Sequence, residues 1–193
     1  RYSVMLAGCG MGSSPGTRAF LEQLLLGESP PSLPMVIDAD GLNNLSQVNE
    51  WWRRLGAPVV LTPHPGEMAT LTGLSTAEIQ GDRITSARHW SHHWNATVVL
   101  KGAHTLIAEP GGMVRISPFA NPGLASGGTG DVLAGIIAGL IAQGLPLGVA
   151  ASCGVFIHGQ AGEAVRKRIG DTGSIASDLV ELLPETIHEL KRS

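Results

Sequence analysis

The chain lacks the features that mark several large classes of protein. It has 193 residues but only two cysteines, Cys9 and Cys153, which lie far apart without the spacing of a metal site. This scarcity argues against a disulfide framework and favours a reducing cytoplasm. No basic run occurs and the net charge is −3, which disfavours nucleic acid and anionic membranes as partners. No signal peptide is visible, and the apolar stretch 132–142 is too short to span a bilayer.

What is present fits one globular α/β domain over residues 1–193. Hydrophobic residues make up 43% of the chain and charged residues 15%, which is enough for a sizeable core. The 26 glycines and 12 prolines are scattered through ordered-looking segments, which indicates tight turns rather than low complexity. The sequence begins at Arg1 and enters a strand almost at once, so we expect an N-terminally truncated domain.

Short apolar runs alternate with longer helical patterns. We predict strands at 4–7, 35–37, 58–61 and 97–100, and a hairpin of strands at 105–108 and 113–116. We predict helices at 16–26, 45–55, 76–94, 131–143, 147–168 and 175–190. The strands show no clean alternation, as expected when helices cover both faces of a mainly parallel sheet. The pattern predicts a doubly wound α/β layer whose ligands bind at the carboxyl ends of the strands, where Gly, Asp, His or Lys follows.

The segment 121–135 carries the most chemical information. Gly127, Gly128 and Gly130 directly precede a long apolar helix, and Asp131 stands where that helix begins. Glycines let a backbone approach a ligand closely, and the free N–H groups of a first helical turn bind anions. A carboxylate beside a phosphate site makes chemical sense if it takes a proton from the hydroxyl that accepts the phosphoryl group. The segment therefore indicates phosphoryl transfer to an alcohol, although a plain capped helix start has the same pattern.

Four sequence blocks carry a family resemblance. They are VIDADGLN at 36–43, LTPHPGEM at 61–68, VLKGAHT at 99–105 and NPGLASGGTGD at 121–131. In this order they resemble the signature blocks of the ADP/ATP-dependent NAD(P)H-hydrate dehydratases, the carbohydrate-kinase-like domain of the metabolite-repair proteins. The resemblance implies a ribokinase-like fold, with a central, mainly parallel sheet flanked by helices on both faces and the N-terminal strands missing here. It also implies dehydration of NADHX and NADPHX with ADP or ATP as co-substrate and Mg²⁺ as a further cofactor.

The same resemblance assigns roles to residues. Asp131 is expected to contact the hydrate and to act as the base for its C6 hydroxyl. His64 is expected to contact the hydrate as well, together with a glycine of the turn that holds Gly10 and Gly12. The resemblance places the nucleotide at Lys101, Gly102, Ala103, His104, Thr105 and Gly130. The chemistry of phosphoryl transfer adds the backbone of Gly127, Gly128 and Thr129 as further nucleotide-binding residues.

Other polar residues leave two interpretations open. Glu67 either orders Mg²⁺ through water or caps the following helix, and Asp38 and Asp40 either help the cation or hold loops through Asx turns. Cys9 stands where the family often has proline, and His104 stands where a small residue is common. Neither departure removes a reactive group.

Two alternatives to the dehydratase remain at this stage. A small-molecule kinase of the same fold, acting on a hydroxymethylpyrimidine, a thiazole or a sugar alcohol, fits the Gly-Thr-Gly-Asp unit equally well. A non-catalytic nucleotide-binding module is disfavoured because such a module needs no base. By analogy we expect a homo-oligomer and, fused or as a partner, an NAD(P)HX epimerase.

Overall fold

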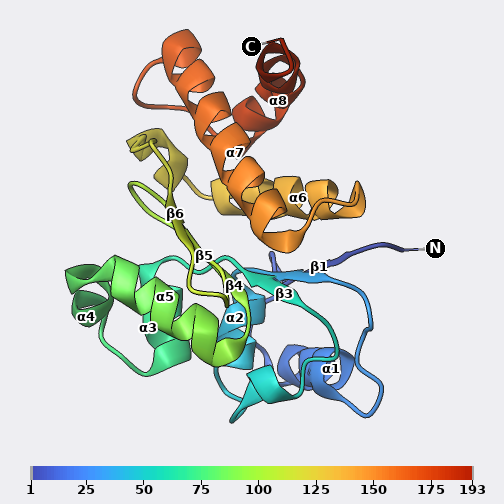
Figure 1. The fold of residues 1–193 in the computed structure, drawn as a ribbon. Helices are drawn as coiled ribbons and strands as arrows, with labels where there is room; N and C mark the ends of the chain where they lie inside the picture. Colours follow the sequence, from blue (N-terminus) through green and yellow to red (C-terminus); the bar gives the residue numbers. More distant parts are fainter. Residues whose placement is uncertain (1, 193) are drawn as a thin grey trace.

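The short apolar runs of the sequence pair into one six-stranded sheet (Figure 1). The computed structural model describes residues 2–192. The strands are β1 Met5–Ala7, β2 Met35–Ile37, β3 Val59–Leu61, β4 Thr97–Leu100, β5 Leu106–Ala108 and β6 Val114–Ile116. They lie in the order of the sequence; β1 to β4 are parallel, and β5 and β6 form an antiparallel hairpin at the edge. The predicted strands 35–37 and 97–100 match β2 and β4 residue for residue.

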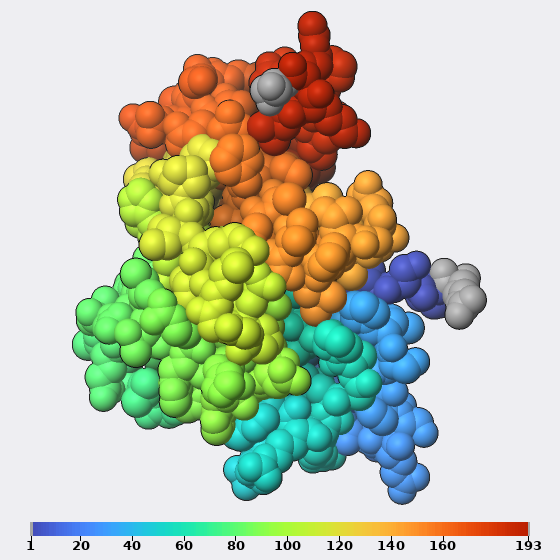
Figure 2. Space-filling view, in the orientation of Figure 1, coloured from blue at the N-terminus to red at the C-terminus, as the bar shows by residue number. Residues whose placement is uncertain are grey.

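Helices cover both faces of this sheet (Figure 1). One layer holds α1 Pro15–Leu26, α2 Asp40–Leu45, α3 Pro65–Thr72, α4 Thr76–Gly81 and α5 Arg83–Trp94. The other face carries α6 Thr129–Ala142 and α7 Leu147–Ile169, and α8 Ala176–Leu190 packs on α7 away from the sheet (Figures 1 and 2). Two 3₁₀ turns, Trp51–Arg53 and Pro122–Ala125, complete the order. None of the helices described is long and apolar enough to cross a membrane.

Alternate residues of a strand pack into two separate hydrophobic cores, one on each face of the sheet. On β2, Met35 and Ile37 belong to the core under α1 to α5, whereas Val36 belongs to the core under α6 and α7. This alternation follows from the two-residue period of a strand, and burial on both faces explains why every residue of β2 to β5 is apolar except Thr97.

Four details differ from the sequence-based predictions. The sheet is not doubly wound, because the strand order runs without reversal, and successive right-handed crossovers in one direction place all their helices on one face. The predicted helix 45–55 is wrong: α2 lies earlier, and Glu50 adopts a left-handed conformation. The predicted helix 76–94 is two helices, since Asp82 leaves helical geometry and its carboxylate caps α5 at the Thr85 N–H. Helix α3 was not among the predicted helix ranges, although the capping interpretation of Glu67 implied a helix at this place, and His64-Pro-Gly-Glu67 holds its N-terminal cap.

Candidate functional site

The carboxyl ends of the parallel strands and the start of α6 meet at one edge of the sheet, as predicted from the sequence. Asp38 follows β2 and Lys101 follows β4, and their side chains form an ion pair with Lys101 Nζ 2.7 Å from Asp38 Oδ1. Glu67, in the first turn after β3, places Oε2 3.5 Å from the same ammonium. Two carboxylates therefore compensate the one charge of Lys101. Both carboxylates are buried, so their pairing with the lysine is what makes their burial tolerable.

Asp38 retains one unused oxygen. Its Oδ2 is buried and has no hydrogen-bond partner among the described residues. A Cβ built on Gly130 would lie 3.7 Å from this oxygen and 3.3 Å from Lys101 Nζ. The absence of a side chain at Gly130 therefore lets the first turn of α6 approach the Asp38–Lys101 pair.

His64 and Glu67 cap α3 reciprocally. The ring Nδ1 of His64 accepts hydrogen bonds from the N–H groups of Gly66 (3.0 Å) and Glu67 (3.2 Å), and Glu67 Oε2 accepts one from the His64 N–H (2.7 Å). Because Nδ1 is an acceptor, the proton of the neutral ring sits on Nε2, which lies 3.5 Å from Glu67 Oε1. Of the two interpretations of Glu67, helix capping is present; its role toward Mg²⁺ stays a prediction.

The start of α6 is held by side chains on both sides. Gly128 precedes the helix with φ 84°, a left-handed conformation that glycine adopts without strain. Thr129 Oγ1 lies 2.6 Å from the Leu124 carbonyl oxygen, and its own carbonyl accepts a hydrogen bond from His158 Nε2 at 2.9 Å. Burial lowers the pKa of His158 to about 4, so the ring is neutral and Nε2–H is the donor. Helix α7 thereby fixes the turn that was predicted to bind phosphate.

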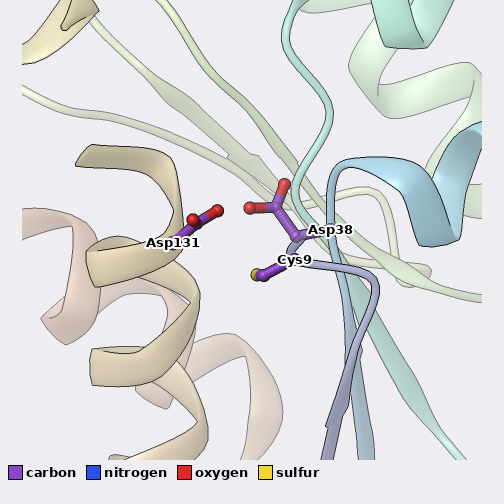
Figure 3. Close-up of side chains that lie close together, drawn as sticks. All are labelled: Cys9, Asp38 and Asp131. Carbon is purple, nitrogen blue, oxygen red and sulfur yellow. The ribbon is translucent and has the colours of Figure 1, made fainter. Parts of the chain in front are cut away.

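Asp131 lies beside Asp38 and Cys9, which the sequence did not connect (Figure 3). One carboxylate oxygen of each aspartate and the Cys9 sulfur all lie within 4.8 Å of one another, the one such group of potential metal ligands in residues 2–192. Burial, the charge of Asp38 and a hydrogen bond to Asp131 together raise the pKa of the Cys9 thiol to about 12. The thiol is therefore protonated at neutral pH and acts as a donor to the base. The sequence signal that could have pointed to Cys9 as a site residue was its position between Gly8 and Gly10, directly after β1.

A cavity of about 630 Å³ opens next to the α6 start. Six of the residues predicted to bind the nucleotide line it: Lys101, Gly102, Ala103, Thr105, Thr129 and Gly130. His64 lines it too, and so do apolar residues that the sequence analysis missed, among them Phe119, Leu124 and Val155. They had no recognisable pattern because they come from three separate places: Phe119 from a loop, Leu124 from the 3₁₀ turn Pro122–Ala125 and Val155 from α7.

Several predicted residues lie outside the lining of this cavity. His104 turns away: its N–H donates to the Phe119 carbonyl and its ring Nδ1 lies 3.1 Å from the Ser117 carbonyl. Gly127 and Gly128 precede the helix and do not line the cavity. Their nucleotide contacts stay predictions.

The predicted hydrate side of the site is built by the turn after β1. The Gly12 N–H donates to Asp40 Oδ2 at 2.7 Å, and Asn44 Nδ2 donates to the Gly12 carbonyl at 3.1 Å. Asp40 therefore holds a loop, the second of its two interpretations. Gly10 and Gly12 both have positive φ, and nothing lies within 4 Å of a Cβ built at either residue, so this turn presents backbone to solvent.

The fold defines a class, the ribokinase-like α/β proteins: the chain superposes on a ribokinase-like superfamily protein of Enterococcus faecalis with a TM-score of 0.83 at 28% identity, over 97% of this chain and 63% of that one. A model of the NAD(P)H-hydrate dehydratase family matches residues 1–185, and the chain belongs to that family.

Individual relatives agree with this assignment. The chain is 44% identical over 188 residues to the bifunctional NAD(P)H-hydrate repair enzyme of Moorella thermoacetica, covering 97% of this chain and 35% of that protein. It is 40% identical to the ADP-dependent (S)-NAD(P)H-hydrate dehydratase of Neisseria meningitidis, covering 86% of this chain and 56% of that one. The ADP/ATP-dependent dehydratase of Bacillus subtilis, co-crystallised with ATP and Mg²⁺, superposes with a TM-score of 0.85 at 29% identity, over 97% of this chain and 66% of that one. The chain thus spans about a third to two thirds of the length of these relatives.

Proposed function

We propose that the protein dehydrates NADHX and NADPHX to NADH and NADPH at the expense of an adenine nucleotide. The supporting observation is the division of the site at the start of α6. Gly130 lines the cavity, whereas Asp131, the next residue, faces Cys9 and Asp38 at the ends of β1 and β2. A nucleotide in the cavity and a hydroxyl at Asp131 would approach the same helix start from two sides.

The chemistry follows from the poor leaving ability of hydroxide. Asp131 takes the proton of the C6 hydroxyl as its oxygen attacks the terminal phosphorus of the nucleotide, and the nucleotide leaves one phosphate shorter. The N–H groups at the start of α6 stabilise the charge on the transferring phosphoryl group. The C6–O bond then breaks, the ring-nitrogen lone pair supplies the electrons and inorganic phosphate leaves. The resulting iminium loses a proton from C5 to water, and the electrons of that C–H bond form the C5–C6 double bond. The cofactor returns to its dihydropyridine form without any oxidant or reductant.

The donor set also suits Mg²⁺. Asp38 Oδ2 is a buried oxygen with no hydrogen-bond partner, and carboxylate oxygens are the ligands that Mg²⁺ prefers. The protonated Cys9 thiol is a soft group that Mg²⁺ does not need. When bound, the ion would neutralise charge on the nucleotide phosphates. The relative co-crystallised with ATP and Mg²⁺ supports this assignment.

Partners and setting belong to the same proposal. Relatives are named ADP-dependent or ADP/ATP-dependent, so either nucleotide is a candidate co-substrate here. Bifunctional repair enzymes among the relatives favour an NAD(P)HX epimerase as a fused or separate partner. We infer a cytoplasmic homo-oligomer, in keeping with the substrates and with the two free cysteines.

Phosphate release and dihydronicotinamide absorbance, measured in one sample with NADHX and ADP or ATP, test the reaction. One phosphate per recovered cofactor, with no stable phosphoester, is the expected result. A small-molecule kinase would accumulate a phosphoester, and a binding module would release nothing. Cofactor recovery in the absence of nucleotide would refute the mechanism.

A further inference from the structure

The guanidinium of Arg83 hydrogen-bonds to the backbone of the turn that follows β4, residues 101–105. Arg83 is the first residue of α5, and the helix break at Asp82 aims its side chain across 17 to 20 residues of sequence. Nη1 donates to the Ala103 carbonyl at 2.6 Å, while Nη2 lies 3.2 Å from the Leu100 carbonyl oxygen and 3.3 Å from that of Lys101. One guanidinium therefore bridges three backbone oxygens of one turn.

These contacts decide where the amides of the turn point. In a trans peptide the N–H lies opposite the C=O, and the described chain contains no cis peptide. Because Arg83 holds the Lys101 carbonyl, the Gly102 N–H points away from Arg83. Thr105 Oγ1 holds the Gly102 carbonyl at 3.0 Å, which orients the Ala103 N–H in the same manner. Neither N–H has an acceptor within residues 2–192, and both residues line the cavity.

Gly102 makes this arrangement possible. Its φ of 135° is a conformation that side chains disfavour, and a Cβ there would lie 3.1 Å from Arg83 Nη2. The charge on Arg83 is also uncompensated: no carboxylate pairs with it in the described part of the chain, whereas Asp38 and Glu67 pair with Lys101. Arg83 therefore adds positive potential behind the turn, where an anionic ligand would gain from it.

We propose that Arg83 is a positioning residue that holds the N–H groups of Gly102 and Ala103 ready for a phosphate oxygen of the nucleotide. The inference rests on the proposed function in taking the ligand to be an adenine nucleotide. Arginine suits the role because its planar fork contacts several acceptors at once, which a lysine ammonium on a flexible stem does not do.

Calorimetric titration of the whole protein with ADP and with adenosine tests the inference. Arg83→Met is expected to weaken ADP binding about tenfold or more, the usual scale for hydrogen bonds to charged groups, and to leave adenosine binding unchanged. The ADP affinity of Arg83→Lys should lie between that of the wild type and that of Arg83→Met. Guanidinium ion added to Arg83→Ala should restore part of the ADP affinity. Arg88→Met removes an exposed arginine from the same helix and should match the wild type.

The outcomes separate the two proposals. Equal ADP affinity in wild type and Arg83→Met would overturn the role of Arg83 and leave the dehydratase proposal intact. Equal losses for ADP and adenosine, without rescue by guanidinium, would mean a general structural role and would also overturn it. Failure of the wild type to bind any adenine nucleotide would overturn the proposed function and this inference with it.

Discussion

The buried His158 should lower the free energy of unfolding of the protein as the pH falls from 6.5 to about 4. The imidazole is buried between α7 and the start of α6, where Nε2 donates to the Thr129 carbonyl. Burial is the main reason that its pKa falls from 6.5 to about 4, and the nearby charge of Lys101 acts in the same direction. The unfolded chain therefore binds a proton below pH 6.5 that the folded protein does not bind until about pH 4.

The sign and size of the effect follow from this difference. A depressed pKa contributes stability that is present above pH 6.5 and is lost as pH falls toward 4. A fall in pKa from 6.5 to about 4 corresponds to about 3 kcal/mol of unfolding free energy lost across that window. At pH 7 both states hold a neutral ring, so the contribution is intact.

Substitution of His158 by Gln separates this contribution from other titrations. The glutamine amide can still donate to the Thr129 carbonyl but does not titrate. Urea unfolding at pH 7 and near pH 4 should show the variant losing about 3 kcal/mol less than the wild type between the two conditions. His188→Gln, which removes an exposed imidazole on α8, is the matched control. If wild type and His158→Gln lost stability in parallel, the buried neutral imidazole would not be the cause.

Three further predictions concern the site. Asp131→Asn should lower turnover by about 10²–10⁴-fold with nucleotide affinity retained; near-normal turnover would exclude Asp131 as the base. Gly130→Val should abolish ADP binding in calorimetry because its Cβ meets the Asp38–Lys101 pair, whereas Gly135→Val, with nothing within 4 Å of the added Cβ, should not. In the Cys153→Ser protein, Cys9, with its pKa raised to about 12, should react with iodoacetamide near pH 8 about 10³-fold more slowly than a free cysteine, and Asp131→Asn should accelerate it; alkylation at the rate of a free thiol would disprove the thiol's link to the two carboxylates.

The local sequence was sufficient for most elements and for the helix that carries the base. Apolar runs predicted strands β2 and β4, and helical periodicity predicted helices α6 to α8. Both patterns are properties of neighbouring residues. The glycines before α6 likewise indicated a backbone that a ligand can approach. The sequence also predicted that Asp38 and Lys101 lie at the same edge of the sheet, because the carboxyl ends of parallel strands meet there.

Partnership between distant residues was decided only by the tertiary structure. Nothing in the local sequence links Cys9 to Asp131, His158 to Thr129 or Arg83 to the turn after β4. Each contact depends on which face of the sheet a helix covers and on where that helix begins, and those choices are made by packing rather than by local propensity. The sequence by itself therefore determined the elements and the chemistry they carry. Folding decided which amide, carbonyl and carboxylate groups face the cavity, since the geometry of a site is a property of elements brought together from far apart in the chain.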